Sequence, residues 1–439
     1  MKALQLLALP TAAFLAIAMP IGGHAQPATG VHPETPSAFN DGDGGSSNGA
    51  RPPDEAWPRW SWSGYGQFNY ERVDFFPNAQ ATVPQRRSRL DLRRVVIEPQ
   101  VRISPRWRFQ AEIEFEHGGT GSAVEYEPEE AGEFEAEIER GGEVVLENAF
   151  LEYSSSPAVN WRVGEMTVPF GMLNTWHRPD QSFTIERSLA ESSLIPGTWH
   201  DLGIAFTGVS RSTRYTLMLV RALDSSGFTG YGFVSEGSRQ RLEYREAKDL
   251  ALVASVDHVP MPGVVVGGAL YHGDSSGNRP RANLDASANV TLAEIHGRWE
   301  RGPLIVRGEY LFGRLQNADK VTQANFNTFN ASELGVSRTP VGSEARAFFV
   351  EAGYDVMSLL GARSDRLVVF ARYDAYDTHA GTPVAISTNP RYDREAVTVG
   401  LNYVPDKHVV IKAEFSRRSN ASATANRQDY AGLAAGFHF

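Results

Sequence analysis

The chain has 439 residues, with 42 Lys and Arg against 52 Asp and Glu and a formal net charge of −10 at pH 7. This acidic balance predicts no nucleic-acid partner, and the absence of cysteine excludes disulfide bonds and thiolate metal sites. After residue 25 there is no apolar stretch of 18 residues, so no transmembrane helix is predicted there.

Residues 1–25 have the features of a secretory signal peptide. Lys2 gives a basic start, an apolar run follows from Ala3 to Ala18, and small residues lead to Ala25. Pro10 interrupts the apolar run, which argues against an uncleaved anchor helix. We expect cleavage after Ala25 and export to the periplasm.

Residues 26–60 are rich in Gly, Asp, Ser and Pro, as in the stretch from Asp41 to Gly49. Such a composition offers too little apolar surface to order itself. It also shows no heptad pattern that would support a coiled coil. We therefore expect a flexible periplasmic tail.

Residues 61–439 repeat one pattern about sixteen times, and the segment from Trp107 to Glu116 shows it most clearly. Apolar and polar residues alternate at every step, so a β-strand here has one apolar and one charged face. About 9 to 11 residues in a strand cross a bilayer. The pattern predicts an all-β fold, a transmembrane antiparallel up-and-down β-barrel of about 16 strands.

The connections between the predicted strands alternate between short and long, as outer-membrane barrels require. The short ones include Ser104-Pro105, Ser210-Arg211 and Arg301-Gly302, and the joint from Met357 to Asp365 is an exception. We predict strands near 61–73, 87–102, 106–116, 144–154, 159–167, 200–209, 212–223, 247–258, 264–273, 288–300, 303–316, 344–356, 366–374, 395–404, 407–416 and 429–439.

The lipid-facing side of each strand follows from the same alternation. In the strand near 366–374, Leu367, Val369 and Ala371 form the apolar face, and a slip by one residue would expose Arg372 to lipid. The chain ends in alternating apolar residues and a terminal Phe439. This end resembles the signal by which bacterial barrels are recognised by the insertion machinery of the outer membrane.

The connection from about 168 to 199 and its surroundings contain several short motifs. They are Arg86-Arg87-Ser88-Arg89-Leu90, Ala149-Phe150-Leu151-Glu152-Tyr153, Arg162-Val163-Gly164, Pro169-Phe170-Gly171, His177-Arg178-Pro179-Asp180 and Glu186-Arg187-Ser188-Leu189. With these motifs the region resembles the phosphate-selective porin O and P family. The resemblance is most specific over residues 86–209. It implies a trimeric outer-membrane channel for anions such as phosphate or polyphosphate, narrowed by an inward third loop and lined with basic side chains.

The candidate pore residues come from the second strand and the third loop. Alternation places Arg87, Arg89 and Arg93 on one face, which we expect to line the lumen. Arg178, Glu186 and Arg187 in the loop complete the predicted constriction. Guanidinium groups bind phosphate oxygens in a fork, so a row of them offers successive weak anion sites. Alternatively, these arginines pair with neighbouring acids such as Asp91 and brace the wall.

The connection 117–143 carries nine glutamates against Arg140. It is interpreted as a solvated external loop, a raised hairpin or a cation-binding loop. The chain lacks the motifs of serine hydrolases, zinc proteases and phosphate-binding loops, so no catalytic residues, cofactor or metal site are predicted. The alternatives to an anion-selective porin are a non-selective or cation-preferring porin and a non-conducting surface barrel that binds a partner through 117–143.

Overall fold

A computed structural model of the chain describes residues 59–439, except 79, 120–124, 128–134, 138–141, 239–245, 330–338 and 362–363. The predicted signal peptide (1–25) and almost all of the predicted tail (26–60) lie outside the described residues. Much of the acidic connection 117–143 does so too.

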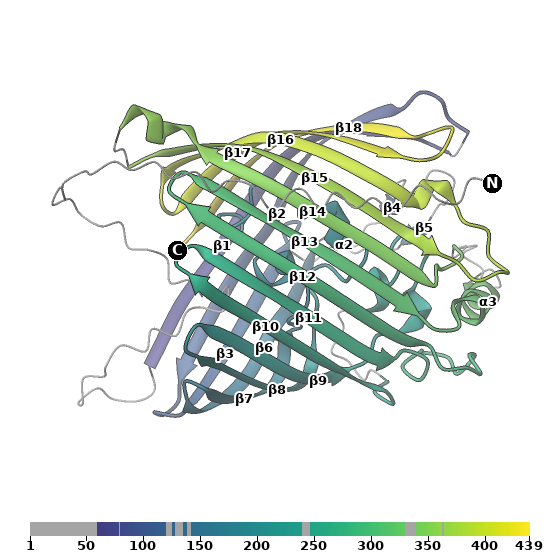
Figure 1. Cartoon of the computed structure of the whole chain (residues 1–439), viewed down its shortest axis with the longest axis horizontal. Coiled ribbons are helices and arrows are strands. Elements are labelled where there is room, and N and C mark those ends of the chain that lie inside the picture. Colours follow the sequence, from purple (N-terminus) through teal and green to yellow (C-terminus); the bar gives the residue numbers. More distant parts are fainter. Residues whose placement is uncertain are drawn as a thin grey trace. The chain divides into compact units, whose positions relative to one another are not determined.

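In the part of the chain that the structure describes, sixteen strands form one closed barrel (Figure 1). They are β1 (Arg59–Phe75), β2 (Gln85–Arg102), β3 (Trp107–Glu116), β6 (Glu143–Ser156), β7 (Val159–Thr167), β8 (His200–Ser210), β9 (Thr213–Arg221), β10 (Leu250–Met261), β11 (Val264–Asp274), β12 (Asn289–Arg301), β13 (Leu304–Leu315), β14 (Glu344–Asp355), β15 (Arg366–Gly381), β16 (Asp393–Asp406), β17 (Val409–Asn420) and β18 (Arg427–His438).

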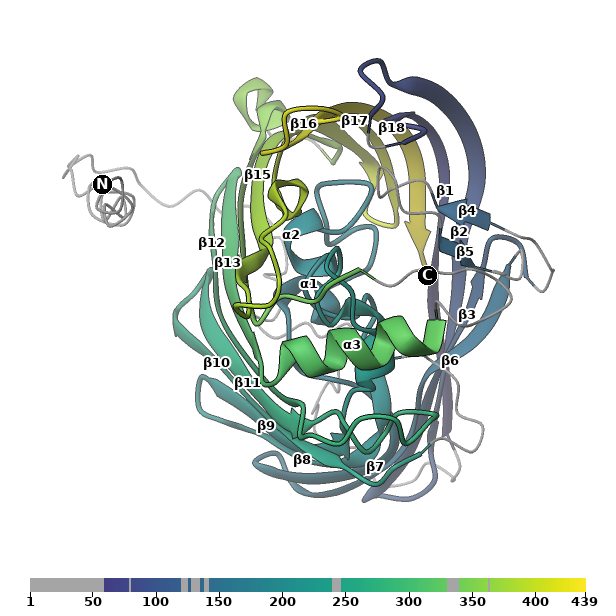
Figure 2. The same ribbon diagram turned by 90° about the vertical axis from the view of Figure 1, so that its right-hand side faces the viewer.

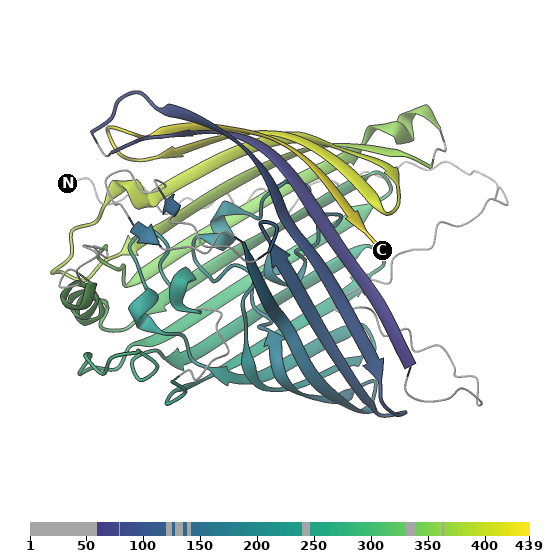
Figure 3. The same cartoon turned by 180° about the vertical axis from the view of Figure 1, so that it is seen from behind.

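Each barrel strand pairs antiparallel with its neighbours in sequence, and β1 pairs with β18 to close the ring (Figure 3). At one end the connections have two to four residues, except 356–365, whereas at the other end they have six to 32. The predicted barrel class, strand number and alternation of connections are confirmed. A separate hairpin of β4 (Glu125–Glu127) and β5 (Glu135–Glu137) lies in the acidic connection.

The register places the predicted apolar sets on the outside. Ile295 faces Tyr310 across β12 and β13, and Val369 faces Leu401 across β15 and β16. Val369 and Leu401 are 44% and 46% exposed, whereas Arg372 on the inner face of β15 is 3% exposed. Since apolar side chains line the outside of a closed barrel, the surface suits a lipid bilayer.

The connections between the barrel strands contain the described helices and 3-10 turns. These are α1 (Met172–Thr175), α2 (Leu189–Ser192), α3 (Ala318–Phe329) and the 3-10 turns η1 (Ser225–Gly227), η2 (Ser235–Gly237), η3 (Val356–Leu360) and η4 (Pro390–Tyr392). Viewed from the end with the long connections, α1 and α2 lie within the ring of strands (Figure 2). None of the described helices has the length and apolar character needed to cross a membrane.

The strand pairing is irregular at several places, and two β-bulges among them bear on the interior. Between β1 and β2, Gln67 faces Arg94 while Phe68 faces Leu92, so Arg93 is an extra residue. Between β3 and β6, the pairing skips Glu147 in the same way. A bulge re-aims the side chains beside it, and both bulges add a charged residue near the interior.

Candidate pore constriction

The connection between β7 and β8, residues 168–199, is called loop 3 and is closed at its base by Asn174. The amide nitrogen of Asn174 donates to the carbonyl of Val168 at 3.0 Å, and its Oδ1 accepts from the backbone N–H of Trp199 at 2.6 Å. The N–H of Val168 also donates to the Trp199 carbonyl at 2.8 Å. These bonds hold the two ends of loop 3 together.

The middle of loop 3 is hydrogen-bonded to β16 and β17, on the other side of the ring from β7 and β8. The Lys412 ammonium donates to the carbonyls of Ser182 and Thr184, each at 2.8 Å. The Asn402 amide donates to the carbonyl of Phe183 at 2.9 Å. Because Lys412 and Asn402 lie on the inner faces of their strands, loop 3 runs between opposite walls.

Glycines on the inner wall make room for the apolar side chains of loop 3. A Cβ added at Gly353 of β14 would lie 2.4 Å from the ring of Phe183. Added Cβ atoms at Gly432 and Gly436 of β18 would each lie 2.7 Å from Ile185 and Pro179, respectively. Larger residues at these positions would therefore displace loop 3.

A buried ion-pair network lies beneath the loop on β13, β14 and β15. Glu351 accepts hydrogen bonds from the guanidinium groups of both Arg307 and Arg372. Arg307 also donates to the carbonyl of Gln181 in loop 3 at 2.6 Å. The network thus joins three strands and the loop, and all three charged residues are at most 3% exposed.

The structure brings two of the predicted site residues together, Arg93 and Glu186. Nη2 of Arg93 donates to Oε2 of Glu186 at 3.3 Å, and the Asn69 amide donates to Oε1 at the same distance. The Arg93 and Glu186 side chains are 38% and 30% exposed. They are charged groups inside the barrel that remain in contact with water.

The other predicted residues do not join this pair in one cluster. Arg89 binds Glu71 at 2.7 Å, and Arg178 binds Asp180 through two hydrogen bonds of 3.2 Å. Pairing with acids, the alternative given by the sequence, is thus found for several of these arginines. Glu71 is a partner that the sequence did not suggest, whereas Asp91 pairs with His117 at 2.9 Å. Arg87 lies over the ring of Phe75, and Arg187 donates to the hydroxyl of Thr198.

The pKa values of Glu186 and Arg187 are both shifted, but for different reasons. Burial raises the pKa of Glu186, but the positive charges of Arg93 and Arg94 outweigh this and lower the pKa below its usual value. Burial lowers the pKa of Arg187, and repulsion from Arg94 adds to the effect. Glu186 is therefore held ionised by its basic surroundings.

Strict alternation along β2, which puts Arg93 on the inner face, would put Arg94 on the outer face, and this expectation is wrong. The bulge at Arg93 shifts the alternation, so Arg94 donates to the carbonyl of His177 at 3.4 Å inside the barrel. Glu147, Arg307 and Glu351 were also absent from the predicted site. A regular alternation cannot show a bulge, but Arg307 and Glu351 do follow the polar face of their strands.

Part of the inner face of each strand from β8 to β14 is apolar, unlike the polar lining that alternation predicted. Met218, Val220 and Val253 are at most 1% exposed and belong to an apolar core with Phe170, Trp199 and Phe228 from the long connections. The sequence did carry a signal, because Leu217-Met218-Leu219-Val220 is apolar on both faces. This part of the interior is filled by packed side chains.

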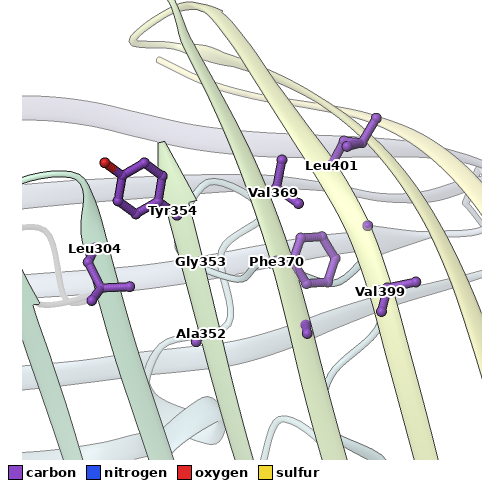
Figure 4. Close-up of a pocket in the computed structure, with 10 residues that line it drawn as sticks. Leu304, Ala352, Gly353, Tyr354, Val369, Phe370, Val399 and Leu401 are labelled. Carbon is purple, nitrogen blue, oxygen red and sulfur yellow. The ribbon is translucent and has the colours of Figure 1, made fainter. Parts of the chain in front are cut away.

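A hollow on the outside of β13 to β16 is unrelated to this interior (Figure 4). Leu304, Val369 and Leu401 border it. No ionisable group other than the Tyr354 hydroxyl lines the hollow. It belongs to the apolar outer surface.

Comparison with known proteins supports the fold. No family model matches the chain. A protein of Aquifex aeolicus (strain VF5), described as uncharacterized, is 25% identical over 359 residues, which cover 81% of this chain and 75% of that protein.

Two solved structures have similar folds. The outer membrane channel DcaP of Acinetobacter baumannii gives a TM-score of 0.53 at 13% identity, covering 88% of this chain and 99% of that one. OmpF of Salmonella typhi, in complex with daunomycin, gives 0.50 at 9% identity over 87% and 97%. The chain therefore has the 16-stranded barrel fold of outer-membrane porins.

Proposed function

We propose that the chain is an outer-membrane channel for passive diffusion of small solutes, with a preference for anions such as phosphate or polyphosphate. The observation that carries this proposal is loop 3, which is bonded to opposite inner walls and leaves Arg93 and Glu186 partly exposed beside it. Such a loop narrows a barrel and places charges where solutes pass. The likeness to DcaP, which is described as a channel, supports the same function.

The passage runs along β1 and β2. The apolar core fills part of the interior along β8 to β14, whereas Arg89 and Arg93 on β2 are 40% and 38% exposed. Ions follow the wetted side of the interior because leaving water for an apolar region is costly. A solute therefore meets Arg87, Arg89 and Arg93 in succession.

Anion preference comes from this row of arginines, with Arg178 and Arg187 adding positive charge around loop 3. Each guanidinium stays charged and offers paired donors to phosphate oxygens. Because Arg89 and Arg93 also have carboxylate partners, anion binding is weak at each step. Weak successive sites suit conduction better than one tight site.

The test is single-channel recording in a planar bilayer, with the reversal potential measured across a KCl gradient and then with added phosphate. We expect chloride-biased conductance that phosphate reduces. The variant Arg89→Glu should lower the ratio of anion to cation permeability by about twofold or more, because it reverses a charge at the passage. Arg417→Glu is the matched control, since Arg417 is 49% exposed but lies on the outer face.

Other results would decide between the alternatives. Cation bias in the wild-type protein would retain the channel and discard the anion preference. An absence of conductance would favour a surface barrel that binds a partner through 117–143, and deletion of Tyr126 to Arg140 would then abolish binding.

The proposal includes export and assembly. We expect removal of Met1 to Ala25, so that amino-terminal sequencing of the outer-membrane protein begins at Gln26. We also expect a homotrimer surrounded by outer-membrane lipid. Native mass spectrometry of the detergent-solubilised protein distinguishes a trimer from a monomer.

A further inference from the structure

Three side chains that play no part in the proposed anion passage converge on the inner wall near β3 and β6. They are Glu112 of β3, Glu147 of β6 and His177 of loop 3, and one ligand atom from each lies within 4.8 Å of the others. Nε2 of His177 is 3.6 Å from Oε1 of Glu112. The cluster therefore joins loop 3 to two strands of the wall.

The ring of His177 is oriented toward the two carboxylates. Its Nδ1 lies 3.1 Å from the carbonyl oxygen of Asn174, which can only accept, so Nδ1 carries the proton. Nε2 then presents its lone pair to the cluster. An imidazole held in this way by a backbone carbonyl is the usual arrangement of a histidine metal ligand.

The cluster contains more lone pairs than protons. Nε2 of His177 and Oε1 of Glu112 lie 3.0 and 3.1 Å from the same Tyr65 hydroxyl, which has one proton to give. Oε2 of Glu147 has no hydrogen-bond partner, although Glu147 is only 2% exposed. A buried carboxylate oxygen without a partner is costly, and a cation would satisfy all three atoms.

The surrounding charges allow a cation here, because the nearby Arg94 forms its ion pair with Glu114, at 3.7 Å, and not with a residue of the cluster. Among the described residues, neither Glu112 nor Glu147 has an arginine or lysine at ion-pair distance. Asn148 donates to Oε2 of Glu112 at 2.6 Å and leaves Oε1 directed at the cluster. The positive charge of Arg187 also acts on Glu147.

We propose that Glu112, Glu147 and His177 bind a divalent transition-metal ion of the Zn²⁺ class. One imidazole nitrogen with two carboxylate oxygens suits zinc, whereas calcium and magnesium prefer oxygen ligands alone. Tyr65 or a water completes the coordination. The ion joins the first part of loop 3 to β3 and β6. This role does not depend on whether the barrel conducts ions.

The bulge at Glu147 explains how β6 can supply two residues to this site. With regular pairing, β6 would present only one of Glu147 and Asn148 to the interior. The extra residue lets both take part, Glu147 as a ligand and Asn148 as the group that orients Glu112. Bulges often occur where a side chain must be re-aimed for a site.

The test is calorimetric titration of the folded, chelator-treated full-length barrel in detergent with Zn²⁺ alone. We expect one Zn²⁺ per chain, and binding weakened by at least about tenfold in Glu147→Gln and in His177→Gln. His272→Gln is the matched control, because His272 is far in sequence from the cluster and lies on the outer face of β11, where its Nδ1 lies 2.9 Å from the Thr291 hydroxyl. Heat-modifiable migration on gels confirms that each variant is folded.

A second readout reports on loop 3 itself. Zn²⁺ should slow hydrogen exchange of the backbone amides near His177 in the wild-type protein and in His272→Gln, but not in Glu147→Gln. No Zn²⁺ binding by the folded wild-type barrel, or equal binding by wild type and Glu147→Gln, would overturn the proposal.

Discussion

Glu351 is expected to contribute strongly to the stability of the barrel wall beneath loop 3. It accepts hydrogen bonds from Arg307 and Arg372 and is 1% exposed. In Glu351→Gln, two buried guanidinium groups would lose the carboxylate to which both donate. We expect the free energy of unfolding to fall by about 3 to 5 kcal/mol, the usual cost of breaking a buried pair.

This change can be measured by denaturant unfolding in lipid vesicles, followed by tryptophan fluorescence. Glu395→Gln is the control, since Glu395 is exposed and bonds to Tyr373 on the outer face. It should alter the unfolding free energy by less than about 0.5 kcal/mol. Equal effects of the two variants would contradict the assigned role of Glu351.

Glu186 should make the proposed anion preference depend on pH. The pKa of this carboxyl is lowered in the folded barrel because nearby arginines outweigh the effect of burial. A lowered pKa means that ionised Glu186 stabilises the folded state above the unfolded-state pKa, and that this contribution is lost as pH falls through the folded-state value. The ion pair with Arg93 should therefore persist from pH 7 to 5.

Below about pH 4, under the ordinary pKa of a glutamate, protonation of Glu186 should release Arg93 and increase the anion preference. Reversal potentials measured from pH 7 to 3 test this. In Arg93→Gln the acid-induced increase should be absent. An increase that begins near pH 6 would assign it to another group.

The structure of β14 determines where loop 3 rests. Phe183 stacks on Phe370 at 5.6 Å between ring centroids and covers Gly353. In Gly353→Val the new side chain would occupy the place of the Phe183 ring. We expect loop 3 to be displaced, and single-channel conductance to change by about twofold or more because the constriction is altered.

Gly297→Val is the matched control for this change. Gly297 lies on the outer face of β12, where an added Cβ would come no closer than 3.7 Å to the carbonyl of Val265. Its conductance should equal that of the wild type. Unchanged conductance in Gly353→Val, with the barrel folded, would show that loop 3 does not set the aperture.

At the scale of the strands and loops, part of the structure could be predicted from the sequence and part could not. Strand number and register could be predicted because each strand must keep its apolar face in lipid, as Val369 and Leu401 do. The candidate site could be predicted only in part. The positions of Arg94 and Glu147 depend on bulges, and the contacts of Lys412 with loop 3 join residues 228 to 230 positions apart. No local pattern encodes either.

At the scale of the whole molecule, closure depends on the pairing of β1 with the end of β18. The N–H of Gly64 donates to the carbonyl of Phe439 at 3.1 Å, and the N–H of Phe439 donates to that of Gly64 at 2.9 Å. The ring of Phe439 lies over Gly64, and that of Phe437 lies over Gly66. The terminal aromatic residue therefore has a structural place at the seam.

Phe439→Ala separates this structural role from recognition by the insertion machinery. The variant keeps both backbone hydrogen bonds at the seam, so we expect refolding in detergent close to that of the wild type, with about 1 to 3 kcal/mol lost for the aromatic contact. In cells, the amount in the outer membrane should fall by about tenfold if the terminal ring is the insertion signal. Tyr70→Ala, which removes an exposed aromatic side chain from β1 away from the terminus, should leave that amount unchanged. If refolding in detergent falls as strongly as the amount in the outer membrane, the role of Phe439 is limited to closing the barrel.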